Sequence, residues 1–224
     1  MNLKKKAVPD KILILGAGVY GRPFTDHGKV VLCNRYELPD EYNWKEIKLV
    51  VFTGGNDVDP TMYKDYRHPK TNSNVQRDHM EKEYFDTALK NKVPMVGICR
   101  GSQFLTVMNK GSLVQHVTGH GLVGTHSIKT KEGKQVEVTS THHQMMFPKG
   151  DDYTVLAWAE GLSKQYELGS TVAHPKTGDT STKEPEVVWY NKTNSLAVQY
   201  HPEYMETDSG GYKYFQELLK EYVL

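Results

Sequence analysis

Short apolar runs without polar alternation recur in the first half of the chain, each bounded by glycine, proline or polar residues. Val, Ile and Leu dominate these runs. A run of this length and composition is typical of a strand that is buried on both faces of a parallel sheet. The pattern therefore predicts four core strands, at residues 12–15, 30–32, 49–52 and 95–98.

Helical spacing of apolar residues follows some of these runs and returns at the end of the chain. From Asp78 to Asn91 the apolar positions can share one helical face, and Asp78 is expected to be the N-cap. A second helix is predicted from Ser102, with apolar residues up to Met108 on one side, and a closing helix over residues 211–223. Strands that alternate with helices predict an open α/β sheet.

The second half of the chain reads differently, as strands separated by polar loops. These strands are expected at residues 135–139, 153–158, 186–190 and 195–200. The segment 169–185 is rich in Ser, Thr, Lys, Gly and Pro, which predicts an exposed loop or insertion. Since the chain has 224 residues and no internal repeat, we expect one domain over residues 1–224.

Charge and composition exclude several classes of protein. The chain has 28 Lys and Arg against 27 Asp and Glu, a net charge of +1, and a dedicated nucleic-acid binder would usually show a basic excess. No apolar run approaches the roughly 20 residues of a membrane span, and no apolar segment follows Lys4–Lys6 to make a signal peptide. Because there are only two cysteines, a disulfide framework is not expected, and the reducing cytoplasm is the expected location.

A glycine pattern follows the first predicted strand, Gly16-Ala17-Gly18-Val19-Tyr20-Gly21. In a dinucleotide-binding fold such glycines let a pyrophosphate approach a helix N-terminus. Here Arg22-Pro23 interrupts the helix that would carry this N-terminus, and no acidic residue ends the second strand. A tight turn is therefore the favoured interpretation, and no cofactor is expected.

Cys99 is the strongest candidate for chemistry. It lies in Gly97-Ile98-Cys99-Arg100-Gly101, where a predicted buried strand runs directly into a predicted helix. This is the nucleophile-elbow arrangement with sulfur in place of oxygen, and the two glycines leave room for the sharp turn. The backbone N–H of Arg100 would face a developing oxyanion. Cys33 has no flanking glycine and is expected to be a buried apolar residue.

Two further segments could complete the site. A thiolate nucleophile needs a base and a group that orients the base, and His201-Pro202-Glu203 supplies both directly after a predicted strand. The glycine pair Gly54-Gly55 follows another strand, and its backbone N–H groups could face a ligand without interference from a Cβ atom. Gly54-Gly55 is therefore a candidate second donor of an oxyanion hole.

These residues resemble the class I glutamine amidotransferase signature, and more fully its gamma-glutamyl hydrolase branch, which includes gamma-glutamyl-gamma-aminobutyrate hydrolases. Besides the Cys99 and His201 motifs, the similarity covers Gly54 to Pro60 with Tyr63, Arg77-Asp78, Gly111 to Gln115 and His142-His143-Gln144. The matching motifs run in the family's order from about residue 49 to residue 203.

The resemblance implies a flavodoxin-like, mostly parallel sheet flanked by helices, with a smaller antiparallel strand element. It also implies a Cys99–His201–Glu203 triad that attacks a gamma-glutamyl amide through a glutamyl thioester. By the same resemblance Gly54, Gly55 and Arg100 would serve the oxyanion, and Gln103 and His143 would line the glutamyl pocket. Arg77 has two readings of equal weight: it clamps the substrate's α-carboxylate, or it pairs with Asp78 or Glu81.

Two questions stay open at this level. The first is whether the chain is a free-standing hydrolase of a small gamma-glutamyl substrate or a glutaminase subunit that supplies ammonia to a separate synthetase. The second concerns the histidines His116, His120, His126, His142 and His143, which suggest zinc. Because glycines break any helix there and no cysteine lies nearby, no metal is expected.

Overall fold

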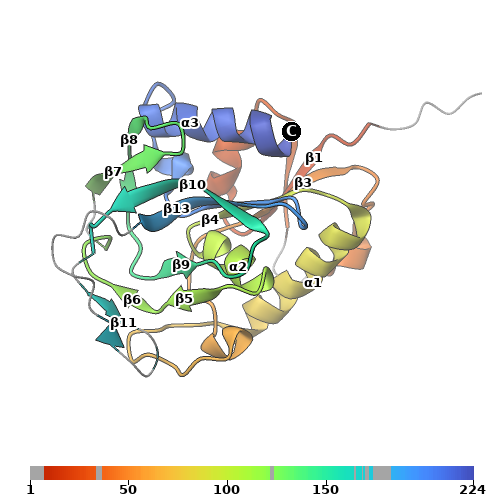
Figure 1. The fold of residues 1–224 in the computed structure, drawn as a ribbon. Helices are drawn as coiled ribbons and strands as arrows, with labels where there is room; N and C mark the ends of the chain where they lie inside the picture. Colours follow the sequence, from red (N-terminus) through yellow and green to blue (C-terminus); the bar gives the residue numbers. More distant parts are fainter. Residues whose placement is uncertain are drawn as a thin grey trace, which may run out of the picture.

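A computed structural model describes residues 8–33, 37–121, 124–163, 165–167, 169, 172–173 and 183–224. Its centre is a nine-stranded sheet whose first five strands run parallel and whose remaining strands run antiparallel (Figure 1). In spatial order the strands are β2 (Lys29–Leu32), β1 (Lys11–Leu15), β3 (Ile47–Phe52), β4 (Met95–Ile98), β14 (Ser195–Val198), β13 (Lys183–Tyr190), β10 (Tyr153–Glu160), β7 (Gly124–Thr130) and β8 (Gln135–Ser140). The expected α/β class is confirmed.

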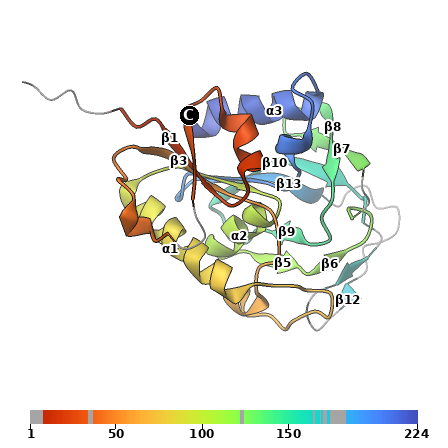
Figure 2. The same ribbon diagram turned by 180° about the vertical axis from the view of Figure 1, so that it is seen from behind.

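Helices cover both faces of this sheet (Figures 1 and 2). One face packs against α1 (Val75–Asn91) and α2 (Arg100–Met108). The other packs against α3 (Gly210–Leu218) and the short helix η1 (Gly18–Phe24). The remaining one-turn helices are η2 (Pro39–Glu41), η3 (Pro60–Tyr63), η4 (Pro202–Tyr204) and the π-helical end of α3, η5 (Leu219–Val223).

The core strands divide their side chains between the two helix layers. In β1, Ile12 and Ile14 face the layer of α3, whereas Leu13 and Leu15 face the layer of α1 and α2. This follows from the two-residue period of a strand and explains why both faces of the strand are apolar. β2 is the exception, because it lies at the sheet edge and Leu32 is 53% exposed. The expectation that residues 30–32 are buried on both faces is therefore wrong.

Two small antiparallel sheets lie beside the main sheet, as the expected smaller antiparallel element implied, although their strands were not predicted individually. One contains β12 (Val172–Ala173), β11 (Tyr166–Glu167) and β6 (His116–Val117), and the other pairs β5 (Ser112–Val114) with β9 (Met145–Phe147). The predicted loop at 169–185 is corrected at both places where the structure describes a strand: residues 172–173 form β12, and β13 begins at Lys183. The rest of that segment lies mostly outside the described residues.

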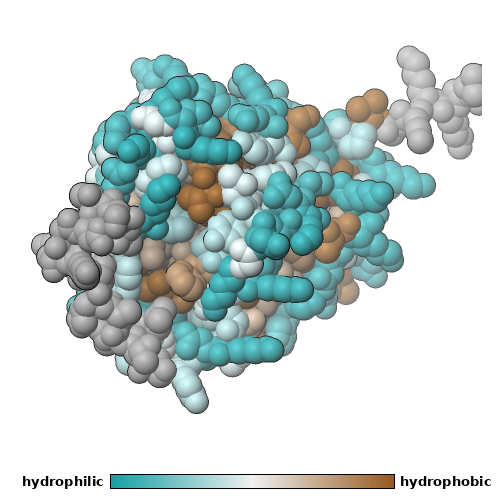
Figure 3. Space-filling view, in the orientation of Figure 1, coloured by the Kyte–Doolittle hydropathy of each residue, from teal (hydrophilic) through white to brown (hydrophobic). Residues whose placement is uncertain are grey.

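The face of the molecule seen in Figure 3 is largely hydrophilic, and apolar side chains show only in small separate areas. None of the helices in the described ranges is long and apolar enough to cross a bilayer.

Close packing at the elbow between β4 and α2 gives a stability test. A Cβ atom on Gly101 would overlap the backbone carbonyl oxygen of Phe52 in β3. We expect Gly101→Ala to lower the free energy of unfolding by about 3 kcal/mol, although alanine is the better helix former by about 1 kcal/mol. Gly124→Ala is the matched control, because no atom lies within 4 Å of its added Cβ. Equal urea midpoints for the two variants would contradict this packing argument.

Candidate active site

The candidate residues meet at the carboxyl ends of three neighbouring parallel strands. Thr53 and Gly54 follow β3, Cys99 follows β4, and His201 lies three residues after the end of β14. These strands are adjacent in the sheet, in the order β3-β4-β14. The carboxyl edge of a parallel sheet is where open α/β folds place their ligands, so residues far apart in the sequence converge there.

Cys99 has the strained backbone of a nucleophile elbow. Its φ and ψ are 53° and −111°, a conformation that is costly for a residue with a side chain. The chain can turn this sharply because Gly97 lies against the backbone of Gly101, where a Cβ atom would overlap. The Cys99 N–H donates to Val198 O at 2.8 Å. The thiol is therefore fixed at the start of α2, and it is partly exposed, whereas Cys33 is buried.

His201 and Glu203 form a hydrogen-bonded pair next to this thiol. The distance between His201 Nδ1 and Glu203 Oε1 is 2.6 Å, and Glu203 is 1% exposed. The His201 N–H donates to Thr139 Oγ1 at 2.8 Å, and Arg22 donates to the backbone oxygen of Glu203 at 3.0 Å. The Glu203 carboxylate holds the ring at Nδ1, and the two backbone contacts fix the segment that carries both residues.

The surroundings of His201 favour its protonated form. Burial of the ring acts to lower its pKa, but hydrogen bonds with Cys99 and Glu203 outweigh this effect and raise the pKa of His201 to about 10. At neutral pH the ring therefore carries a proton. Such a ring can donate a proton to a leaving amine after the thiol has reacted.

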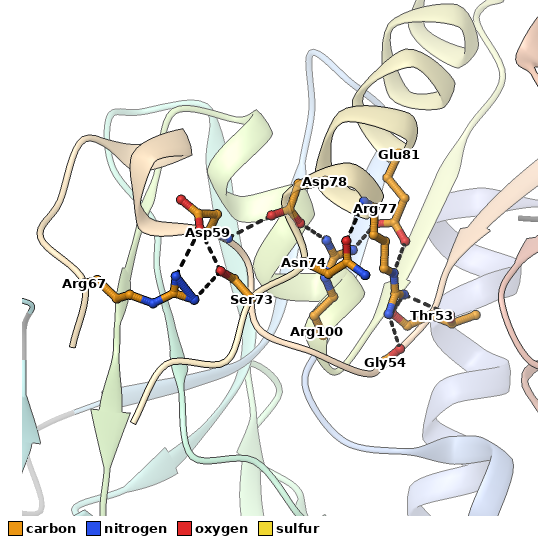
Figure 4. A network of polar contacts seen from close by, with 10 residues as sticks. All are labelled: Thr53, Gly54, Asp59, Arg67, Ser73, Asn74, Arg77, Asp78, Glu81 and Arg100. Carbon is orange, nitrogen blue, oxygen red and sulfur yellow. Dashed lines mark hydrogen bonds and ion pairs between the residues drawn. The ribbon is translucent and has the colours of Figure 1, made fainter. Parts of the chain in front are cut away.

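The loop Thr53-Gly54-Gly55 is held by the guanidinium of Arg77 (Figure 4). Arg77 donates to Thr53 O at 2.9 Å, to Gly54 O at 3.0 Å and to Glu81 Oε1 at 2.7 Å. A trans peptide is planar, so the Gly55 N–H points opposite to the Gly54 carbonyl and hence away from Arg77. Gly55 has a φ of 133°, and a Cβ there would overlap the Arg77 guanidinium. Only glycine fits this position.

The Arg100 side chain belongs to a buried ion network with two carboxylates of α1 (Figure 4). It pairs with Asp78 and Glu81 of α1, and both carboxylates are fully buried. Burial is the main cause that lowers the pKa of Arg100 to about 9. The Arg100 N–H is the first of α2, which has no intrahelical partner, and so it remains available to an anion next to Cys99.

Asp78 is thus a buried ion-pair partner and not the helix cap, and the expectation that it starts the helix is wrong. α1 begins one turn earlier, at Val75, and its cap is Asn74, whose side chain accepts from the Arg77 N–H at 3.1 Å. The second oxygen of Asp78 accepts from the Asp59 N–H at 2.9 Å, which ties the loop before η3 to the same network.

A pocket of about 260 Å³ opens beside the thiol. Of the predicted residues, Gly55, Cys99, Arg100, Gln103 and His143 line it. Gln103 donates to Gln144 O and Gln199 Oε1, each at 3.3 Å, and His143 Nε2 lies 3.2 Å from Asp57 Oδ1. Further lining residues are Asn56, Asp57, Asn72, Thr141, His142 and Gln144.

No sequence pattern identified Asn72 or Thr141 as pocket residues. Asp57 and Asn72 exchange two hydrogen bonds, from Asp57 N to Asn72 O and from Asn72 N to Asp57 Oδ2. This long-range pairing leaves no local pattern in the sequence.

The glycine pattern at 16–21 supports the site in a different way. It leads into the seven-residue 3₁₀ helix η1 and not into an α-helix that could bind a pyrophosphate. The ring centroids of Tyr20 and His201 are 6.2 Å apart. A Cβ on Gly54 would overlap the Tyr20 hydroxyl. η1 therefore packs Tyr20 against both His201 and the Thr53-Gly54-Gly55 loop.

Comparison with known proteins agrees with this architecture. The profile of the peptidase C26 family matches residues 40–163, a range that includes Cys99 and ends before His201. The chain belongs to this family of glutamine amidotransferase-like enzymes.

Three relatives illustrate the similarity. Protein NtpR of Enterococcus hirae is 27% identical over 76% of this chain and 74% of its own length. The gamma-glutamyl-CDP-amidate hydrolase of Campylobacter jejuni is 29% identical over 59% of this chain and 63% of its own length. The crystal structure of a glutamine amidotransferase from Thermotoga maritima superimposes with a TM-score of 0.60 at 14% identity, and the match covers 96% of this chain and 85% of that one.

The raised pKa of His201 can be measured by NMR titration of its ring. We expect Cys99→Ser to lower this pKa, because a hydroxyl does not carry the negative charge of a thiolate, and Cys33→Ser to leave it unchanged. Because the pKa is raised on folding, protonation of His201 stabilises the folded chain. This stabilisation is complete at pH values below the ordinary pKa of about 6.5, and it is lost as the pH rises through the raised pKa of about 10. A ring that titrates near 6.5 in the wild-type chain would contradict the pairing.

Proposed function

We propose that this chain hydrolyses a gamma-glutamyl amide with Cys99 as nucleophile, and that it does so without a partner protein. The observation that carries the proposal is the anchored oxyanion loop beside a thiol–imidazole–carboxylate set. Arg77 holds the Thr53 and Gly54 carbonyls, so the Gly55 N–H is positioned before any substrate or partner arrives. The gamma-glutamyl-CDP-amidate hydrolase among the relatives supports this reaction class.

In the first half of the reaction, Cys99 Sγ attacks the carbonyl carbon of the side-chain amide. Because His201 already carries the proton, the sulfur attacks as a thiolate, and the electron pair of the C=O bond moves onto oxygen. The N–H groups of Gly55 and Arg100 stabilise that oxyanion, and each such donor contributes about 3 to 4 kcal/mol. When the tetrahedral species collapses, the C–N bond breaks, His201 gives its proton to the leaving amine, and a glutamyl thioester remains on Cys99.

In the second half, water attacks the thioester carbon and passes a proton to His201. Collapse breaks the C–S bond, releases glutamate and restores the Cys99 thiolate beside the protonated His201. Glu203 keeps Nδ1 of the ring occupied, so Nε2 does the proton transfer throughout. Gln103 and the 141–144 segment line the pocket and would receive the glutamyl group.

The alternative is a glutaminase that passes ammonia to a separate synthetase, and the presence of a carbamoyl phosphate synthase small chain among the relatives supports it. In such a subunit, docking of the partner would be needed to align the oxyanion donor. The Arg77 contacts favour an aligned donor in the isolated chain.

An assay of the purified chain tests autonomy. The panel runs from glutamine to gamma-glutamyl amides of amines, amino acids and a nucleotide-linked amide, with glutamate release as the readout. We expect turnover of at least one member, retention of this activity in Cys33→Ser, and a loss of several orders of magnitude in Cys99→Ser. Activity that appears only when a synthetase is added would overturn the proposal that the chain acts without a partner protein.

Arg77→Lys separates positioning of the loop from clamping of the substrate. Lysine keeps the charge but cannot donate to the Thr53 carbonyl, the Gly54 carbonyl and Glu81 in one plane. If Arg77 positions the oxyanion loop, kcat falls about tenfold, corresponding to about 1.4 kcal/mol, and KM changes little.

The control for this substitution is Arg67→Lys, since Arg67 is half exposed and lies 3.7 Å from Asp59. A raised KM with unchanged kcat in Arg77→Lys would show the carboxylate clamp instead.

A further inference from the structure

A group of histidine and glutamate side chains lies buried next to the pocket, and the proposed mechanism does not use it. It consists of His120, His126, His142, Glu184 and Glu186, which we call the histidine–glutamate cluster. His120 follows β6, His126 is on β7, His142 follows β8, and both glutamates are on β13. His120, Glu184 and Glu186 are 0% exposed and His142 is 3% exposed.

Hydrogen bonds fix which ring nitrogens carry protons in two of these histidines. His142 Nδ1 lies 2.8 Å from Gln144 O. A carbonyl can only accept, so Nδ1 carries the proton and donates. His120 Nε2 lies 2.7 Å from Glu184 Oε2, and it donates for the same reason. In the neutral rings the remaining nitrogens, His142 Nε2 and His120 Nδ1, carry the free lone pairs. Without a metal, burial acts to lower the pKa of His120, but hydrogen bonds with Glu184 and Glu186 outweigh burial and raise it to about 9. A cation at Nδ1 would therefore replace the proton held there.

Both free nitrogens face the same carboxylate. His120 Nδ1 and His142 Nε2 each lie 3.3 Å from Glu186 Oε1. Neither makes a hydrogen bond with any described residue, and the second oxygen, Glu186 Oε2, also has none. At this distance the lone pair of each nitrogen and the negatively charged carboxylate repel each other, unless a positive charge lies between them.

The formal charge of the cluster also indicates that a cation is needed. Glu184 and Glu186 bring two negative charges into the interior, and within the described residues neither forms an ion pair with a lysine or arginine. Buried carboxylates are normally paired with cations or coordinate a metal. A divalent cation would balance both charges.

We propose that His120 Nδ1, His142 Nε2 and the Glu186 carboxylate bind a divalent cation of the zinc type. One ligand atom from each of the three residues lies within 4.8 Å of the others. Bonds of about 2.0–2.1 Å at tetrahedral angles place ligand atoms about 3.3 Å apart, which is the distance found for both nitrogen–oxygen contacts. Imidazole and carboxylate ligands suit zinc.

The partners of these ligands are those expected around a metal. Gln144 O and Glu184 hold the outer ring nitrogens, as carbonyls and carboxylates commonly do for metal-bound histidines. His126 Nε2 lies 3.1 Å from Glu186 Oε1 and orients the carboxylate. Three protein ligands leave one tetrahedral position, which a water would fill. The cation would have a structural role, because His120 and Glu186 are 0% exposed.

Through His142 the cation would also support the substrate pocket. His142 Nδ1 and Gln103 Nε2 both donate to Gln144 O, and Gln103 lines the pocket beside Cys99. The cation would therefore tie β13 to the 141–144 segment.

Metal binding should be tested in the Cys99→Ser chain, so that the active-site thiol cannot act as a ligand. After dialysis against a chelator, the chain is titrated with Zn²⁺ and, separately, with Co²⁺. We expect one equivalent of each per chain, a visible absorption band of tetrahedral Co²⁺, and a melting temperature that rises with zinc concentration. In the same background Glu186→Gln and His120→Gln should lose this equivalent, whereas His79→Gln, an exposed histidine on α1, should keep it.

The absence of a saturable equivalent in the Cys99→Ser chain overturns the proposal, and that result does not depend on whether the cluster variants fold. Binding that survives in both cluster variants, or an octahedral Co²⁺ spectrum, also overturns it. These readouts do not involve amide hydrolysis, so the metal proposal and the proposed function can fail independently.

Discussion

The contact on which the rest of the site depends is the buried ion network of Arg77, Asp78, Glu81 and Arg100. Arg100 and the two carboxylates are buried, so the loss of Arg100 would leave unpaired buried charges, at a cost of about 3–5 kcal/mol. The network joins α1 to the start of α2 through Arg100 and to the oxyanion loop through Arg77. One set of charges thus fixes the position of the elbow relative to the loop that serves it. The Arg100 side chain pairs with the α1 carboxylates, while its backbone N–H at the start of α2 stays available for the proposed oxyanion.

Much of the fold could be predicted from the sequence, because the core strands and helices carry strong periodic signals. The predictions were wrong where a local sequence pattern suggested one structure but a contact with a residue distant in the sequence determines another. Asp78 has the composition of a helix cap, but its partner is Arg100, 22 residues later, and helical spacing carries no information about that contact. Strand β7 was missed because Gly124–Thr130 contains a single large apolar residue, Ile128, and its other inward positions include His126 and Thr130.

The convergence of the candidate residues Cys99, His201 and Gly54-Gly55 was predictable for a related reason. Elbow, imidazole and glycine pair each follow an apolar strand, and parallel strands end at a common edge, so their convergence requires only the correct sheet order. The histidine–glutamate cluster has no such guide. His120, His142 and Glu186 come together only through the pairing of β7, β8, β10 and β13, and Glu186 has no histidine near it in the sequence. Spacing between histidines therefore argued against a metal, whereas the buried lone pairs in three dimensions argue for one.

The most direct test of the central claim is detection of the covalent intermediate on Cys99. During turnover of a gamma-glutamyl amide the chain is quenched in acid and digested, and the peptides are mapped by mass spectrometry. If Cys99 is the nucleophile, we expect a hydroxylamine-sensitive glutamyl adduct on the peptide that contains Cys99. We expect none on the peptide that contains Cys33, and none in the Cys99→Ser chain. A glutamyl adduct on any other residue, or turnover by Cys99→Ser at the wild-type rate, would contradict the account.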